Sequence, residues 1–107
     1  MDSHKQAYKE VTILLVDDDD IDAIGVTRAL QKLRILNPVV RARDGIEGLA
    51  LLRDPKAVAR PYLVLLDINM PRMNGLEMLS TLRQDPLIAN AVIFVLTTSK
   101  IDEDKVE

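Results

Sequence analysis

The sequence predicts an α/β fold in which a parallel sheet carries helices on both faces, and two observations lead to this prediction. Apolar segments rich in β-branched residues alternate with amphipathic segments of helical period, at intervals of roughly 25 residues, close to the length of a βαβ unit. Most of the apolar segments are continuous rather than alternating, as expected of strands buried on both faces. Right-handed crossovers then give a doubly wound, open sheet.

The four predicted strands are short apolar segments that cover residues 11–16, 39–42, 62–66 and 91–96. The second strand is the shortest and contains Arg41, which suits the edge of a sheet.

Amphipathic segments predict helices over residues 21–36, 46–53 and 76–83, and a fourth helix is predicted from residue 102 onward. In the first helix, the side chains expected to face the sheet are Val26, Ala29, Leu30 and Leu33. Asp20 is placed to cap the start of this helix, and Asn37 with Pro38 is expected to end it.

Composition predicts one domain over residues 1–107, with residues 1–10 as a flexible tail. The absence of cysteine and the single His4 exclude disulfides, thiol catalysis, zinc cages and histidine triads. A net charge of −3 and the scarcity of aromatic residues argue against direct nucleic-acid binding.

The longest apolar run, Ala91–Leu96, is far shorter than the roughly 20 residues of a membrane span. The start of the chain is polar and shows no secretory signal, so we expect a cytoplasmic protein.

Carboxylates follow the first and third predicted strands, at the edge where an open parallel sheet has its binding crevice. Asp17 and Asp18 begin a run of four aspartates, and Asp67 follows the third strand. If these strands are neighbours, the three carboxylates converge. Two carboxylates about 4 Å apart repel by on the order of 4 kcal/mol at an effective dielectric constant of 20, so protons or a divalent cation must relieve the repulsion. An all-oxygen donor set favours Mg²⁺, with Mn²⁺ or Ca²⁺ behind it.

A Mg²⁺ site of this kind predicts phosphoryl chemistry, because Mg²⁺ keeps several waters and accepts phosphate oxygens. A carboxylate beside the ion can act as the nucleophile and form an aspartyl phosphate. Thr97 follows the fourth strand, where its hydroxyl would hydrogen-bond a phosphoryl oxygen.

Each of these features alone has a plainer interpretation. The aspartate run is typical of a solvated turn that caps a helix, Asp67 could form a turn ahead of Met70 and Pro71, and the hydroxyls of residues 97–99 suit a helix start. Their joint occurrence at three strand ends favours the functional interpretation.

These residues resemble the receiver domain of two-component response regulators, the CheY-like family, from about Val11 onward. The resemblance rests on residues 13–18, 65–75 and 95–99. The middle stretch is the most specific, because its aspartate, Met-Pro pair and Asn-Gly pair all fall at the family's spacing. Asp44 and Gly45 at the start of the second helix agree with the family as well. The resemblance implies a flavodoxin-like, three-layer sandwich with strand order 2-1-3-4, the family's fifth strand being absent from this sequence.

By this resemblance, Asp67 is the phosphoacceptor that takes a phosphoryl group from a phosphohistidine of a sensor histidine kinase. Asp17 and Asp18 hold Mg²⁺, Asp18 directly and Asp17 largely through water. Asp67 and the backbone carbonyl of Asn69 are the further ligands of the ion.

The resemblance also assigns the switch. Thr97 is the hydroxyl that moves toward the phosphoryl group, whose added charge of roughly −1.5 to −2 shifts an inactive–active equilibrium. Thr98 stands where the family usually has a small residue, and it is expected to tune access to the site. The implied protein is a phosphoacceptor rather than an enzyme, with self-phosphotransfer and autodephosphorylation as its only reactions.

The resemblance implies a stand-alone receiver that signals by docking an unidentified protein target, with homodimerisation left open. Residues 96–99 and the spacer 53–61 are similar to those of regulators paired with bacterial phytochrome kinases. The family's fifth strand ends in a Lys-Pro pair and precedes a fifth helix, whereas Lys100 and Lys105 precede no proline. We therefore expect a longer natural chain, and an intact mass near 12.0 kDa would refute that expectation.

Two alternatives stay open at this stage. The strand-end acids also match a haloacid-dehalogenase-like phosphatase, with Asp17 as nucleophile, Asp19 as acid and Thr97 as the hydroxyl of its second motif. Its weaknesses are the small size of the chain and the unexplained stretch 67–75. The other alternative is a pseudo-receiver, a binding module that works without phosphorylation.

Overall fold

A four-stranded parallel sheet forms the middle layer of the computed structural model, which describes residues 10–68, 70 and 74–96. Its strands are β1 (Thr12–Val16), β2 (Val39–Ala42), β3 (Tyr62–Asp67) and β4 (Val92–Leu96). They lie in the order β2-β1-β3-β4, and every neighbouring pair is parallel. The predicted doubly wound sheet and its strand order are therefore confirmed.

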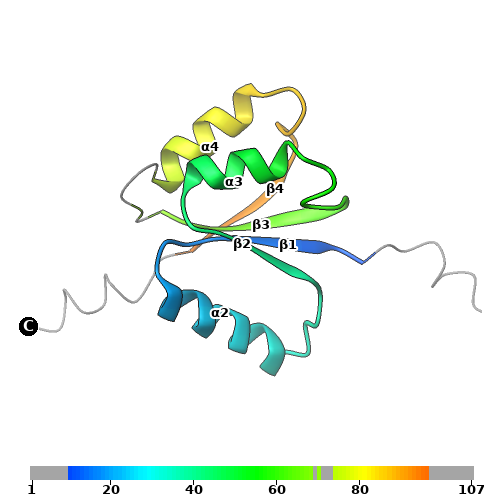
Figure 1. Cartoon of the computed structure of the whole chain (residues 1–107), viewed down its shortest axis with the longest axis vertical. Coiled ribbons are helices and arrows are strands. Elements are labelled where there is room, and N and C mark those ends of the chain that lie inside the picture. Colours follow the sequence, from blue (N-terminus) through cyan, green and yellow to red (C-terminus); the bar gives the residue numbers. More distant parts are fainter. Residues whose placement is uncertain (1–9, 69, 71–73, 97–107) are drawn as a thin grey trace, which may run out of the picture.

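Helices lie on both faces of the sheet (Figure 1). The helices are α2 (Asp20–Lys32), α3 (Gly45–Leu52) and α4 (Gly75–Gln84). Figure 1 shows α2 on one side, and α3 beside α4 on the other. The helix expected from residue 102 and the expected tail up to residue 9 lie outside the described residues. Across the part of the chain that is described, no helix combines the length and the apolar character needed to cross a membrane.

The main core lies between the sheet and the α3–α4 layer. It contains Leu14, Val16, Ala42, Leu49, Leu52, Val58, Val64, Leu66, Met70, Met78, Leu82 and Ile88. The two helices approach closely at Gly48, where an added Cβ would lie only 2.9 Å from Cε of Met78. This contact ties α3 and α4 together over the centre of the sheet.

Helix α2 departs from its predicted bounds at both ends. Its N-cap is Asp19 rather than Asp20, because Oδ1 of Asp19 accepts the N–H groups of Ile21 and Asp22 at 2.8 and 3.1 Å. Asp20 is the first helical residue, and its carboxylate pairs instead with Arg41 of β2 and with Arg43, which directly follows β2.

The end of α2 comes four residues earlier than predicted. Arg34 has a positive φ of 63°, and Ile35 N–H donates to the carbonyl of Leu30 at 2.8 Å. Together with the bond from Arg34 N–H to the carbonyl of Gln31, this is a Schellman end. Asn37 does not stop the helix: its Nδ2 donates to the carbonyl of Val11 at 2.8 Å and ties the loop to β1.

The burial predicted for α2 is only partly correct. Val26 and Leu30 are half-buried as side chains facing the sheet should be, whereas Ala29 and Leu33 are exposed. Among the described residues, α2 is the only helix on its face (Figure 1), so side chains on its flanks meet no neighbouring helix. Leu33 also lies beyond the last turn, as the C-cap.

Candidate functional site

Three aspartates come together at the carboxyl ends of β1 and β3. Asp17 and Asp18 directly follow β1, and Asp67 is the last residue of β3. Because these strands pair with Val16 opposite Leu66, the residues that follow emerge side by side. One carboxylate oxygen from each aspartate lies within 4.8 Å of the others. We call Asp17, Asp18 and Asp67 the acidic trio.

The acidic trio is largely removed from water. Asp17 and Asp67 are fully buried, and Asp18 is half-buried. Oδ1 of Asp17 accepts the N–H of Asp19 at 2.9 Å, whereas its Oδ2 is buried and accepts no hydrogen bond within the described part of the chain. A buried carboxylate oxygen in this state is costly unless a proton or a cation is present.

Burial raises the pKa of Asp17 from its usual 3.8 to about 6. The N–H of Asp19 opposes this rise, and the negative charges of Asp67, Asp22 and Asp18 add to it. Near neutral pH the trio therefore holds negative charge at an energetic cost. Carboxylate oxygens at this spacing fit a hard divalent cation such as Mg²⁺ or Mn²⁺, which would offset that cost.

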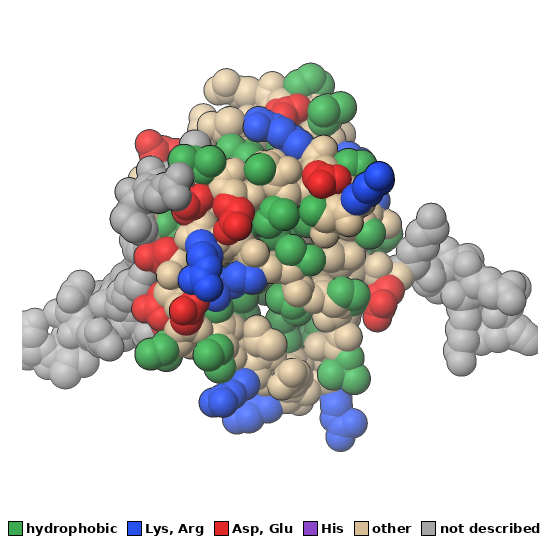
Figure 2. All heavy atoms as spheres, viewed as in Figure 1, with side chains coloured by type: hydrophobic (Ala, Val, Ile, Leu, Met, Phe, Trp, Pro, Cys, Tyr) green, Lys and Arg blue, Asp and Glu red, His purple; other side chains and the backbone are tan. Residues whose placement is uncertain are grey.

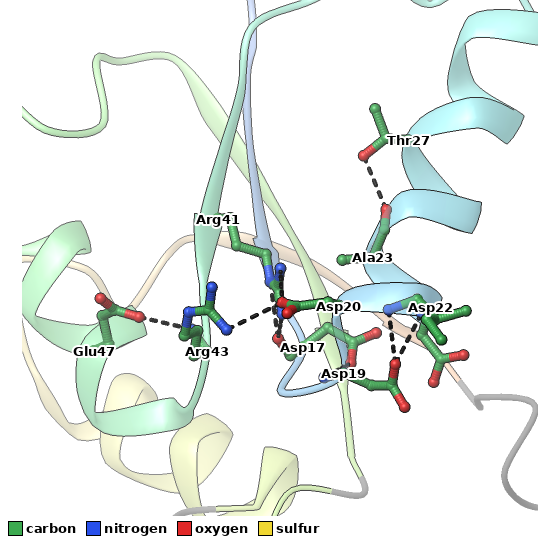
Figure 3. A network of polar contacts seen from close by, with 10 residues as sticks. Asp17, Asp19, Asp20, Asp22, Ala23, Thr27, Arg41, Arg43 and Glu47 are labelled. Atoms are coloured by element: carbon green, nitrogen blue, oxygen red, sulfur yellow. Dashed lines mark hydrogen bonds and ion pairs between the residues drawn. The ribbon is translucent and has the colours of Figure 1, made fainter.

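A network of arginine contacts supports the turn between β1 and α2 (Figure 3). Arg41 donates through Nε and Nη2 to the backbone carbonyl of Asp17, at 2.9 and 2.8 Å. Its Nη1 and that of Arg43 both reach Oδ1 of Asp20, at 2.9 and 3.0 Å. The hydrogen bond from Arg41, followed by the charge of Arg43, lowers the pKa of Asp20. Figure 2 shows acidic side chains gathered at this end of the molecule with basic side chains among them.

From the sequence, Arg41 is predicted only to mark an edge strand, and its contact with the β1–α2 turn was not predicted. The signal was the Arg-Ala-Arg pattern of residues 41–43, which begins in β2 and ends just after it. Arg41 and Arg43 both reach Oδ1 of Asp20 in the aspartate run.

Gly75 allows the start of α4 to approach the end of β3. A Cβ at this position would lie 2.7 Å from Cα of Ile68 and 2.8 Å from the carbonyl oxygen of Asp67. Asn74 caps the helix by accepting the N–H of Glu77 at 2.9 Å, and the Glu77 side chain accepts the N–H of Asn74 at 3.0 Å. The Asn-Gly pair of the sequence motif thus has a structural role directly behind Asp67.

Of the remaining candidate residues, the structure describes Asp44 but not the other three. Asp44 caps α3 by accepting the N–H of Glu47 at 2.8 Å, which agrees with its expected place at the start of the second helix. Asn69, Thr97 and Thr98 lie outside the described residues, so their expected roles stay predictions.

The fold and the site together define a class of protein: doubly wound α/β domains with a cation-binding acidic cluster at the carboxyl ends of the central strands. The conserved sequence pattern of one such family, described as the response regulator receiver domain, matches residues 13–107. The chain belongs to the response regulator receiver domain family.

Individual relatives agree with this assignment. Response regulator Rcp1 from Synechocystis sp. is 35% identical over 95 residues, which cover 86% of this chain and 65% of Rcp1. This chain thus spans slightly less than two thirds of the length of that relative. The solved structure of the bacteriophytochrome response regulator AtBRR has a TM-score of 0.73 at 35% identity, over 92% of this chain and 74% of AtBRR.

Two further solved structures are also similar to this chain. The phosphorylated cyanobacterial phytochrome response regulator RcpA has a TM-score of 0.73 at 34% identity, over 90% of this chain and 71% of RcpA. The Mn²⁺-bound form of Rcp1 has a TM-score of 0.70 at 34% identity, over 88% of this chain and 70% of Rcp1.

Family membership argues against one of the two alternatives left open by the sequence, the haloacid-dehalogenase-like phosphatase. It supports a receiver of two-component signalling, and nothing in the comparisons supports the phosphatase or the pseudo-receiver. The carboxylate of Asp19, the acid of the phosphatase alternative, accepts two N–H groups as the cap of α2. The acidic trio supplies carboxylate oxygens of the kind that a divalent metal ion takes as ligands.

Proposed function

We propose that this receiver accepts a phosphoryl group on Asp67 with Mg²⁺ bound at the acidic trio, and that phosphorylation switches its binding to a protein partner. The observation that carries the proposal is the convergence of three carboxylates within 4.8 Å, one of which has a raised pKa. The phosphorylated form of RcpA and the Mn²⁺-bound form of Rcp1, both related to this chain, support it.

The metal site would use carboxylate oxygens of Asp17, Asp18 and Asp67, with the backbone carbonyl of Asn69 as a further ligand. The ion, when bound, supplies positive charge for the phosphoryl oxygens. The Asp67 carboxylate forms a bond to phosphorus while the bond from phosphorus to the histidine nitrogen of the donor breaks, and hydrolysis of the aspartyl phosphate later restores Asp67. Mg²⁺ is the proposed ion and Mn²⁺ a substitute.

The switch would involve residues next to β4. Thr97 would move toward the phosphoryl group and hydrogen-bond one of its oxygens, and Thr98 would tune access to it. We expect Thr97→Ala to be phosphorylated normally but to lose phosphorylation-dependent partner binding. Normal binding by the phosphorylated variant would argue against this role.

The proposed partners are a sensor histidine kinase, of the phytochrome class by analogy with AtBRR and RcpA, and a downstream protein target. We place the protein in the cytoplasm, where both would be accessible. In this proposal it acts on no separate substrate, and its only reactions are self-phosphotransfer and autodephosphorylation.

The test is to incubate the protein with acetyl phosphate and Mg²⁺ and to map the modified residue by mass spectrometry. We expect one phosphoryl group on Asp67, and no modification without a divalent cation. Asp67→Asn should fold normally and remain unmodified. Modification of Asp17 instead of Asp67, or undiminished labelling of Asp67→Asn, would show that the acceptor lies elsewhere.

A further inference from the structure

Arg41 makes three hydrogen bonds to the β1–α2 turn. Two of its nitrogens hold one oxygen, the backbone carbonyl of Asp17, and its third nitrogen holds the carboxylate of Asp20. The Arg41 side chain is only 26% exposed, and it lies on the edge strand β2, paired with Leu15 of β1. It therefore links the sheet edge to the first turn of α2.

The contact with the Asp17 carbonyl matters because of where that oxygen lies. It belongs to the peptide group between Asp17 and Asp18, and a peptide group is planar. Holding its oxygen therefore fixes the orientation of the unit that joins two members of the acidic trio. The N–H of Asp17 is held as well, because it donates to the carbonyl of Ala42 at 3.0 Å.

We infer that Arg41 is a positioning residue for the acidic trio, which sets the directions of the Asp17 and Asp18 carboxylates and thereby the affinity for a divalent cation. This inference rests on the metal site of the proposed function. Arg41 does not touch the ion in this scheme, and it acts only through the backbone of Asp17 and the carboxylate of Asp20.

Charge and positioning predict effects of opposite sign. A guanidinium near a cation site repels the cation, so loss of its charge alone should strengthen cation binding. Loss of positioning should weaken it, because residues that orient metal ligands typically contribute 10- to 100-fold to metal affinity. The direction of the change therefore separates the two effects.

Arg43 provides the matched control. It shares Oδ1 of Asp20 with Arg41, carries the same charge, and follows Arg41 by two residues on the same side of the chain. Its own side chain is 64% exposed, and no hydrogen bond links it to the Asp17 carbonyl. Arg43→Gln removes a nearby positive charge and leaves that contact in place.

The experiment is to titrate Mn²⁺ into the wild type, Arg41→Gln, Arg41→Lys and Arg43→Gln by calorimetry, after thermal melts show that each is folded at the working temperature. We expect Arg41→Gln and Arg41→Lys to bind Mn²⁺ about tenfold more weakly. Arg43→Gln should bind as tightly as the wild type or more tightly. Lysine keeps the charge but cannot make the three contacts of the guanidinium. Arg41→Lys therefore tests the positioning role of Arg41 even if Arg41→Gln does not fold.

Equal or tighter Mn²⁺ binding by the Arg41 variants would overturn the inference, and so would equal weakening by Arg43→Gln. Asp18→Asn separates this failure from failure of the proposed function. If Asp18→Asn loses Mn²⁺ binding while the Arg41 variants keep it, only the role of Arg41 is wrong. If the wild type binds no Mn²⁺, or Asp18→Asn binds it as well as the wild type, the metal site is wrong and the inference falls with it.

Discussion

The buried charge of Asp17 should make the metal-free protein measurably less stable at neutral pH than the Asp17→Asn variant. The pKa of Asp17 is raised from 3.8 to about 6 in the folded state, so between these values the folded protein binds more protons than the unfolded chain. The contribution of Asp17 to the free energy of unfolding is then fully present below about pH 4 and is lost as the pH rises through about 6. A pKa rise of this size corresponds to about 3 kcal/mol.

The assay is urea unfolding followed by circular dichroism, in EDTA, for the wild type and Asp17→Asn at pH 4.5 and pH 7.5. The free-energy difference between the two proteins should shift by about 2 kcal/mol in favour of the variant at the higher pH, because pH 4.5 lies above the unfolded pKa and part of the roughly 3 kcal/mol is already lost there. Comparing proteins at each pH cancels groups that titrate the other way, such as Asp20 and Asp85, whose pKa values are lowered. A difference that is the same at both pH values would refute the reasoning.

Three further predictions concern stability. Mg²⁺ at 100 times its Kd should stabilise the wild type by about 2.7 kcal/mol but leave Asp18→Asn unchanged in thermal melts, and equal stabilisation would contradict the site. Gly75→Ala should cost roughly 1–3 kcal/mol, because its Cβ would meet backbone at Ile68. Its control, Gly25→Ala, has nothing within 4 Å and should gain about 0.5–1 kcal/mol; equal effects in urea unfolding would refute this contrast. Arg34→Gly should stabilise α2 by up to about 1 kcal/mol, since φ is 63° there, and a loss in the same assay would contradict the Schellman end.

Strand prediction succeeded because parallel strands buried on both faces leave a direct mark in the sequence. The apolar runs of β1 and β3 correspond to the centre of the observed sheet, and the short strand with Arg41 lies at its edge. The prediction was wrong for the fourth apolar run, because β4 lies at the other edge of the described sheet and its Val92, Phe94 and Val95 are exposed. Helix ends were harder to predict, because their positions depend on local contacts. Asp19 and Asp20 have the same side chain, yet in the structure Asp19 caps the helix while Asp20 pairs with Arg41 and Arg43.

The same limit applies to the site. That the carboxylates at the ends of β1 and β3 converge follows from strand order, and strand order is constrained by crossover rules. The contact between Arg41 and the Asp17 carbonyl joins residues 24 positions apart and depends on the register in which Arg41 lies opposite Leu15. A shift of one residue would turn the guanidinium to the other face, so no pattern in the sequence alone could establish it.

The hydrogen bonds that hold the acidic trio in place also keep its carboxylates close together, so that they repel one another. Relieving the repulsion by turning Asp18 outward would be the cheapest response of a flexible turn, and it would remove a ligand. Here the turn is held by the cap at Asp19 and by Arg41 on the Asp17 carbonyl, so the charges cannot separate readily. The repulsion is then left to be relieved by binding a proton or a cation, and an unfavourable cluster of carboxylates becomes a source of affinity for the ion that phosphoryl transfer requires.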